Sequence, residues 1–238
     1  MDHPLLVPDS AIRFILFQRT AYLRFPRNRL IRLIRKAVPL LTYERLVRLE
    51  ASFRKERVKP HYRLDIADEY LSIREHLPPS CSTVLDVGCG VAGIDVFLHR
   101  HYEGTRVHFF LLDKSTTEKR VYYEFQQRGA FYNSLDVARE LLVLNGVRAG
   151  DVTLLEATEA NEVRVEQEVD LAISLISWGF HYPVSTYLAQ VCDVLSENGT
   201  LILDVRRCTD GMDVLNDRFS HVAVISTHPK YDRVLCRK

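Results

Sequence analysis

Short runs of apolar residues alternate with amphipathic segments between residues 82 and 205. The apolar runs are rich in branched side chains and predict strands that are buried on both faces: Thr83–Val87, Val107–Leu112, Val152–Leu155, Leu171–Ile176 and Thr200–Val205. Helical spacing between them predicts helices over Ile94–Tyr102, Leu135–Leu144 and Thr186–Leu195. Alternating strands and helices predict a parallel sheet joined by right-handed crossovers.

Two further apolar runs close the chain, His221–Ser226 and Tyr231–Cys236. The residues between them are too few for a crossover helix, so the runs predict an antiparallel hairpin. The expected fold is therefore α/β, with a seven-stranded, mostly parallel sheet that ends in this hairpin.

The first 60 residues follow a different pattern. Asn28–Val38 divides into a cationic arc and an apolar arc, which predicts an amphipathic helix, and Ala11–Tyr22 and Tyr43–Arg54 also have helical spacing. Because proline interrupts helices, Lys59-Pro60 predicts a boundary. We expect an N-terminal helical cap over residues 1–60 and a sheet domain over residues 61–238.

Charge divides the chain at nearly the same place. Residues 1–63 carry a net charge of +10 and residues 64–238 a net charge of −9, although the whole chain carries +1. The basic front is expected to cap the acidic remainder. The alternatives are binding of RNA, peripheral contact of residues 10–40 with anionic lipid, and contact between copies of the chain in a homo-oligomer.

Composition narrows the class of protein. Hydrophobic residues make up 47% of the chain, but no uninterrupted apolar run is long enough to span a membrane. The start, MDHPLLVPDSAIRF, lacks the basic and apolar regions of a secretory signal, and the five cysteines have no CxxC spacing. These features predict a cytoplasmic protein with reduced thiols, with membrane association through the front segment as the alternative.

A glycine turn follows the first predicted strand. In VLDVGCGVAG, Gly88, Gly90 and Gly93 lie between a strand and a helix, where a backbone without side chains can approach a ligand closely. Asp86 is a carboxylate within a buried strand, which is costly without polar partners. Dinucleotide-binding turns do not need this acid, so a nicotinamide oxidoreductase fits the sequence poorly.

The hhDhGCG arrangement of this turn resembles motif I of class I S-adenosylmethionine-dependent methyltransferases. The resemblance covers roughly residues 60–238, and it implies a Rossmann-like methyltransferase fold that binds S-adenosylmethionine. It implies that Asp113, which ends the second strand, accepts the ribose hydroxyls, with Lys114 beside it. The full set of cofactor-binding residues implied in this way is Asp86, Gly88, Cys89, Gly90, Asp113, Lys114, Glu156, Ala157, Ile176 and Arg63.

The octet ISWGFHYP, residues 176–183, follows the fourth predicted strand and contains the only tryptophan. The family arrangement brings this segment beside the glycine turn, so we expect a turn whose aromatic wall faces the transferred methyl group. Trp178 and Phe180 are expected to contact the acceptor, and Tyr182 to position it. His181 is the candidate general base, and the alternative is that it only supports the turn.

A long connection follows Asp113 and contains several aromatic residues. The segment is similar to that of bacterial sugar O-methyltransferases, which makes Tyr122, Tyr123 and Tyr132 candidate acceptor-binding residues; equally, these rings can join the core. The acids near the fifth strand form no compact cluster, so no metal is expected. The leading function is methyl transfer to a hydroxyl of a small molecule or glycan, and RNA methylation is the alternative.

Overall fold

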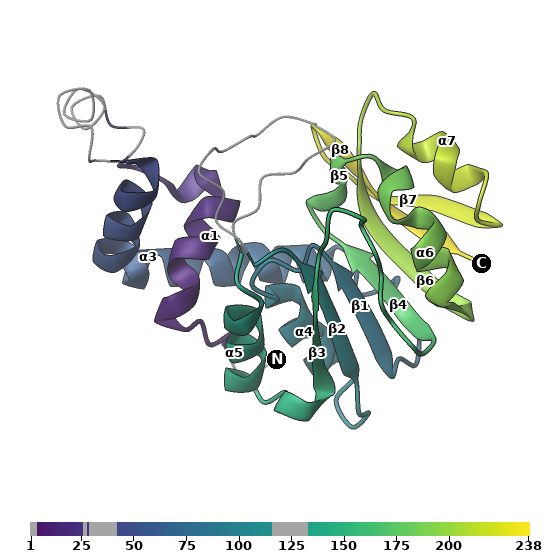
Figure 1. The fold of residues 1–238 in the computed structure, drawn as a ribbon, viewed down its shortest axis with the longest axis horizontal. Coiled ribbons are helices and arrows are strands. Elements are labelled where there is room, and N and C mark those ends of the chain that lie inside the picture. Colours follow the sequence, from purple (N-terminus) through teal and green to yellow (C-terminus); the bar gives the residue numbers. More distant parts are fainter. Residues whose placement is uncertain (1–3, 26–27, 29–41, 116–132) are drawn as a thin grey trace.

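The structure is a computed structural model of the 238-residue chain, and it describes residues 4–25, 28, 42–115 and 133–238. Nearly all of the predicted helix Asn28–Val38 and the candidates Tyr122, Tyr123 and Tyr132 lie outside these ranges. The described chain forms a central sheet with helices on both sides (Figure 1). Among the described residues, no helix has the length and apolar character needed to cross a membrane.

Seven strands form one sheet in the order β3-β2-β1-β4-β6-β8-β7. The strands from β3 to β6 pair in parallel, whereas β8 pairs antiparallel with both β6 and β7, so the predicted sheet and hairpin are confirmed. The strand bounds are β1 Thr83–Val87, β2 His108–Asp113, β3 Val152–Glu156, β4 Val169–Ser174, β6 Leu195–Arg206, β7 His221–Thr227 and β8 Tyr231–Arg237. An eighth strand, β5 (Ser177–Tyr182), packs against β6 outside this order.

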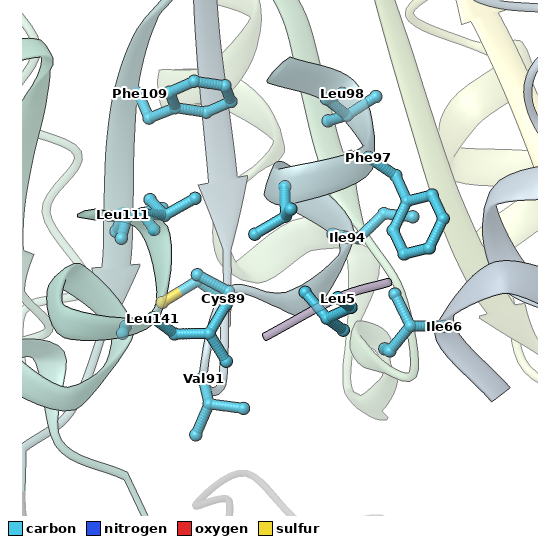
Figure 2. Packing of buried hydrophobic residues seen from close by; sticks show 14 of the residues in the cluster. Leu5, Ile66, Cys89, Val91, Ile94, Phe97, Leu98, Phe109, Leu111 and Leu141 are labelled. Carbon is cyan, nitrogen blue, oxygen red and sulfur yellow. The ribbon is translucent and has the colours of Figure 1, made fainter. Parts of the chain in front are cut away.

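Helices cover both faces of the sheet because successive strand side chains point to opposite sides. Phe109 and Leu111 of β2 join the cluster under the N-terminal segment, α1, α3, α4 and α5, whereas Phe110 and Leu112 join the cluster under α6 and α7. Figure 2 shows the first cluster around Phe109 and Leu111. The helix bounds are α1 Ile12–Gln18, α3 Tyr43–Leu71, α4 Gly93–His101, α5 Leu135–Leu144, α6 Leu188–Val194 and α7 Gly211–Asn216.

Helix α3 passes through the predicted boundary at Lys59-Pro60, so the predicted break is wrong. Thr42 caps its N-terminus by accepting a hydrogen bond from the Arg45 N–H at 3.3 Å, and Pro60 lies inside the helix. Proline removes one helical hydrogen bond and costs about 3 kcal/mol. Val58 and Tyr62 on either side of it are buried in the core, and this packing holds the helix together.

The N-terminal segment packs on the first face of the sheet. Leu5, Phe14 and Ile15 are buried, and they belong to the same hydrophobic cluster as Val84 of β1. In Figure 1, α1 and α3 lie side by side, and residues 9–11 just before α1 contact α5. The apolar side chains of α1 are therefore buried within the fold.

Candidate functional site

A cavity of about 210 Å³ lies at the carboxyl ends of the parallel strands. The glycine turn after β1, the turn between β4 and β5, and parts of α1 and α3 form its lining. The lining residues whose side chains bear nitrogen or oxygen are Gln18, Arg19, Tyr62, Glu69, Asp86, Asp113, Asn133, Ser177, His181 and Tyr182. Strand order reverses between β1 and β4, and ligands of open α/β sheets bind at such a point.

The glycines of the turn allow three other segments to approach it. Gly88 has φ +78°, and a Cβ there would lie 1.8 Å from the Ser177 Oγ atom. A Cβ on Gly90 would lie 2.9 Å from Gln18 Oε1, and a Cβ on Gly93 would lie 2.2 Å from the hydroxyl of Tyr62. The glycines therefore let α1, α3 and the start of β5 pack closely around the turn. The sequence predicted only that a ligand could approach the turn closely.

Asp113 ends β2 and faces the cavity from beside the turn. Its Oδ2 accepts hydrogen bonds from the Gly90 N–H at 2.8 Å and from Asn133 Nδ2 at 3.0 Å, and its Oδ1 accepts one from the Lys114 N–H at 2.7 Å. Burial raises the pKa of Asp113 to about 6, although these hydrogen bonds oppose the shift. At neutral pH the carboxylate is mostly ionised and can accept hydrogen bonds from ligand hydroxyls.

Two buried carboxyl groups lie beneath the glycine turn. Asp86 of β1 is 3% exposed and Asp95 of α4 is fully buried, and the two side chains are within hydrogen-bonding reach of each other. Burial raises the pKa of Asp86 well above its ordinary value, and the charges of Asp95, Asp113 and Glu69 raise it further. Burial raises the pKa of Asp95 to about 7.

The acid pair holds a proton near neutral pH. Among the described residues, no side chain other than Asp86 lies within hydrogen-bonding reach of the Asp95 carboxyl, and the backbone N–H of Asp95 itself lowers the pKa only in part. Two adjacent carboxylates repel each other strongly, so one of the two groups stays protonated. Its proton forms a hydrogen bond to the other carboxyl group. The pair thus replaces the polar partners that Asp86 was expected to require.

The pair makes the stability of the ligand-free protein depend on pH. Because the folded protein holds protons that the unfolded chain loses near pH 4, the free energy of unfolding should fall as the pH rises from about 4 to about 7. Each proton contributes a slope of about 1.4 kcal/mol per pH unit. Asp95→Asn should flatten this slope and raise stability at pH 7.5 by about 1–2 kcal/mol.

Urea unfolding of the ligand-free protein between pH 5 and pH 8 measures this effect. The matched control is Asp217→Asn, because Asp217 is an exposed acid at the end of α7. An Asp95→Asn profile as steep as that of the wild-type protein would contradict the shared proton.

The turn between β4 and β5 forms the wall opposite α1. Ile176 takes the left-handed conformation with φ +53°, and its N–H donates to Asp204 Oδ2 at 3.0 Å. This turn starts β5, which carries Ser177, His181 and Tyr182 along the cavity wall. The buried ion pair of Asp204 with Arg233, at 2.7 Å, therefore fixes the wall from behind.

The two candidate catalytic side chains of the wall are both uncharged at neutral pH. Burial, with a further contribution from the charge of Arg206, lowers the pKa of His181 to about 4, so the imidazole is neutral at neutral pH. Burial raises the pKa of Tyr182 well above its ordinary value. The wall therefore offers a neutral imidazole, which can accept a proton, and a phenol.

Residues 177–182 form a strand, and not the predicted turn. Trp178 is fully buried in the core of the second face, where its indole N–H donates to the Val184 carbonyl at 2.8 Å. Phe180 packs edge-on against Tyr231, with ring centroids 5.5 Å apart, and does not line the cavity. Neither ring is on the cavity wall, which corrects the placement predicted for both.

Arg19 of the N-terminal segment lies in the cavity, where Arg63 was expected. Arg63 donates from Nε to the Leu5 carbonyl at 2.6 Å and is not part of the lining. Arg19 lines the cavity and pairs with Glu69 at 2.8 Å and with Asp65 at 3.3 Å. No local pattern indicates Arg19, because the cavity brings together segments that are distant in the chain.

The remaining predicted cofactor residues fall into two groups. Asp86, Gly88, Cys89, Gly90, Asp113 and Ile176 line the cavity. Lys114, Glu156 and Ala157 lie nearby but outside the lining: Glu156 Oε1 accepts the Ser115 N–H at 2.7 Å, and the Ala157 N–H donates to the Asp113 carbonyl at 2.8 Å.

Two acids within the sheet strands, Asp170 of β4 and Asp204 of β6, are engaged in contacts with other residues. Asp170 accepts hydrogen bonds from Ser82 and Thr83, and Asp204 is paired with Arg233. Within the described part of the chain, no group of three or more histidine, cysteine or acidic residues is placed to hold a metal ion.

Comparison with known proteins identifies the fold. No family model and no curated protein sequence matches the chain. Among solved structures, a precorrin-6y C5,15-methyltransferase from Geobacter metallireducens matches with a TM-score of 0.51 and 16% identity, over 74% of this chain and 88% of that one. An O-methyltransferase family protein from Burkholderia thailandensis matches with a TM-score of 0.53 and 11% identity, over 81% of this chain and 62% of that one.

A candidate O-methyltransferase from Nostoc punctiforme matches over 96% of this chain and 71% of its own, with a TM-score of 0.53 and 15% identity. The chain has the class I methyltransferase fold. At these identities the likeness concerns the fold alone, which agrees with the predicted sheet and hairpin. What the methyltransferase fold does in this protein depends on its own cavity.

Proposed function

We propose that this protein is an S-adenosylmethionine-dependent methyltransferase. The observation that carries the proposal is the cavity, which joins a glycine turn, an acid at the end of β2 and an uncharged wall at the switch point of the sheet. Each of the three has a matching part in the cofactor: Asp113 fits the ribose hydroxyls, the glycine turn fits close approach of the methionine chain, and the wall fits the methyl group.

The charges of the cavity also fit the two charged ends of a bound amino acid. Arg19 supplies a guanidinium for the carboxylate, and Glu69 and Asp86 supply acids for the ammonium group. A positively charged ligand would favour release of the proton that Asp86 and Asp95 share, and the pair would then gain a negative charge. S-adenosylmethionine, when bound, supplies a methyl group on a positively charged sulfur.

The acceptor that we propose is a hydroxyl of a small molecule or sugar. The residues of the wall support this choice, because a hydroxyl must lose a proton and neutral His181 is in the protonation state that accepts one. The phenol of Tyr182 can orient the acceptor by hydrogen bonding. RNA methylation gains less support, since Lys55 and Lys59 of the front segment pair with Asp9 of their own chain.

Calorimetric titration with S-adenosylhomocysteine tests cofactor binding. We expect the wild-type protein to bind, and Asp113→Ala to bind at least tenfold more weakly, because ribose hydrogen bonds to a carboxylate contribute about 1.5–3 kcal/mol. The control is Asp217→Ala, which removes an exposed acid on α7. Lack of binding by the wild-type protein would refute the proposal.

His181→Gln tests proton transfer at the wall. With an acceptor found by screening sugars and phenols, the methyl-transfer rate should fall by about 10²–10⁴-fold while affinity for S-adenosylhomocysteine changes little. Because the pKa of His181 is about 4, the wild-type rate should show no inflection from this group between pH 6 and pH 8. Near-wild-type turnover of the variant would show that His181 only shapes the wall.

A further inference from the structure

Helix α3 has one face in the core and one apolar face in solvent. Its inner side chains include Val58, Tyr62, Ile66 and Tyr70, which are buried. On the outer side, Leu49 is 46% exposed, Phe53 77%, Leu64 66% and Leu71 53%, and the exposed Pro60 lies among them. Among the described elements, α3 packs mainly on α1 and α4, so these two helices leave its outer face uncovered.

The exposed apolar residues lie in one straight stripe. Leu49, Phe53, Pro60, Leu64 and Leu71 follow alternating steps of four and seven residues, which is an 11-residue repeat. Such a repeat stays on one side of an α-helix with little drift, and these positions fall within an arc of about 60° over a length of about 33 Å. Isolated exposed apolar residues are ordinary, but a continuous stripe of this length indicates an interface.

The stripe is self-complementary in an antiparallel arrangement. With a two-fold axis near residue 62, Phe53 meets the partner's Leu71, and Pro60 meets the partner's Leu64. Under the same axis, Arg57 comes beside the partner's Asp68. Arg57 and Asp68 lie on the same flank of the stripe, and a two-fold axis brings each flank against its own copy.

Within the described part of the chain, the side chains of Arg57 and Asp68 have no charged partner. Arg57 and Asp68 are both exposed and lie 11 residues apart along a straight helix, about 16 Å, which is too far for them to pair with each other. Among the described residues neither makes an ion pair. The antiparallel register gives two equivalent Arg57–Asp68 ion pairs between the copies, one on each side of the axis.

We propose that two copies of this chain associate through their α3 helices, antiparallel and centred near residue 62. The same register buries Phe53, Pro60, Leu64 and Leu71 of the stripe and pairs Arg57 with Asp68 of the other copy. Contact with anionic lipid would instead favour a stripe flanked by cations alone, whereas Glu56 and Asp68 stand beside this one. The inner side of α3 carries Tyr62, Ile66 and Glu69 of the cavity, so the dimer would brace the cavity from outside.

Sedimentation equilibrium of the full chain tests the proposal. We expect a dimer for the wild-type protein at micromolar concentration, and at least a tenfold increase in the dimer dissociation constant for Phe53→Asp. The matched control is Leu144→Asp at the end of α5, because Leu144 is 46% exposed but lies outside the stripe. The control should remain a dimer, and circular dichroism should show that both variants are folded.

Reversing the charges of Arg57 and Asp68 tests the antiparallel register. Arg57→Asp and Asp68→Arg should each weaken the dimer, and the double variant Arg57→Asp/Asp68→Arg should return the dissociation constant to within about threefold of the wild-type value. A monomeric wild-type protein would overturn the proposal. Additive weakening in the double variant would overturn the antiparallel register. A Leu144→Asp variant that dissociates as readily as Phe53→Asp would overturn the placement of the interface on the stripe.

Discussion

Arg233→Met is expected to lower the free energy of unfolding by about 3–5 kcal/mol, because it leaves a buried carboxylate without its partner. Arg233 is 1% exposed and Asp204 is fully buried. The guanidinium donates to both carboxyl oxygens of Asp204 at 2.7 and 2.8 Å, and to the Ser72 hydroxyl at the end of α3 at 2.6 Å. Its loss should therefore loosen α3 and the wall of the cavity together, since Asp204 also holds the Ile176 N–H.

An exposed ion pair between the end of β6 and β8 offers a matched control. Arg207 pairs with Asp232 at 2.9 Å, but their side chains are 41% and 25% exposed. An exposed pair of this kind contributes about 0.2–1 kcal/mol, so Arg207→Met should change stability little. Urea unfolding of the two variants at pH 7 compares them directly. Equal losses would mean that the Asp204–Arg233 pair is no more important than a surface ion pair.

Most of the sheet could be predicted because its signals are local. The apolar runs Thr83–Val87 and Tyr231–Cys236 each predict a strand from a few neighbouring residues. The short link before Tyr231 allows only a hairpin. The break predicted at Pro60 was wrong because the sequence shows only the cost of proline, which lacks the N–H that a helix interior uses. The packing of Val58 and Tyr62 that compensates for it depends on distant residues and leaves no local pattern.

The candidate site was predictable only where the position of a residue follows from its own strand or turn. Gly88, Gly90 and Asp113 follow from a strand, a turn and the acid at the end of the next strand, and all three line the cavity. Arg19 and Asn133 reach the same cavity from other parts of the chain, and the hydrogen bond from Gln18 to Asn133, at 3.4 Å, spans 115 residues. Tertiary packing alone brings these segments together.

Trp178 shows why an aromatic cluster is ambiguous. A large ring gains more from burial than from a place on a wet wall, and an indole N–H needs only one acceptor, here the Val184 carbonyl. The octet therefore divides between two environments: Trp178 fills the core, while His181 and Tyr182 face the cavity. Composition alone does not reveal which side of a strand each ring takes.

Gly88→Ala is expected to weaken binding of S-adenosylhomocysteine by about 100-fold or more, which corresponds to about 3 kcal/mol. The new Cβ would lie 1.8 Å from Ser177 Oγ and 2.6 Å from Ser177 Cβ, so the start of β5 must move away from the glycine turn. The Gly88 N–H also donates to the Leu112 carbonyl at 2.7 Å, which prevents the turn from moving instead. The start of β5 would then be displaced from the glycine turn, and the cavity between them would change shape.

Gly104→Ala separates this clash from backbone strain. Gly104 has φ +93°, similar to the +78° of Gly88, but a Cβ there meets no atom within 4 Å. Both variants should lose about 1–2 kcal/mol of stability from the left-handed conformation, but only Gly88→Ala should lose the ligand. Ser177→Gly in the Gly88→Ala background removes the clashing atoms and should restore binding. If that double variant still fails to bind although it unfolds like Gly104→Ala in urea, contact with Ser177 is not what requires a glycine at position 88.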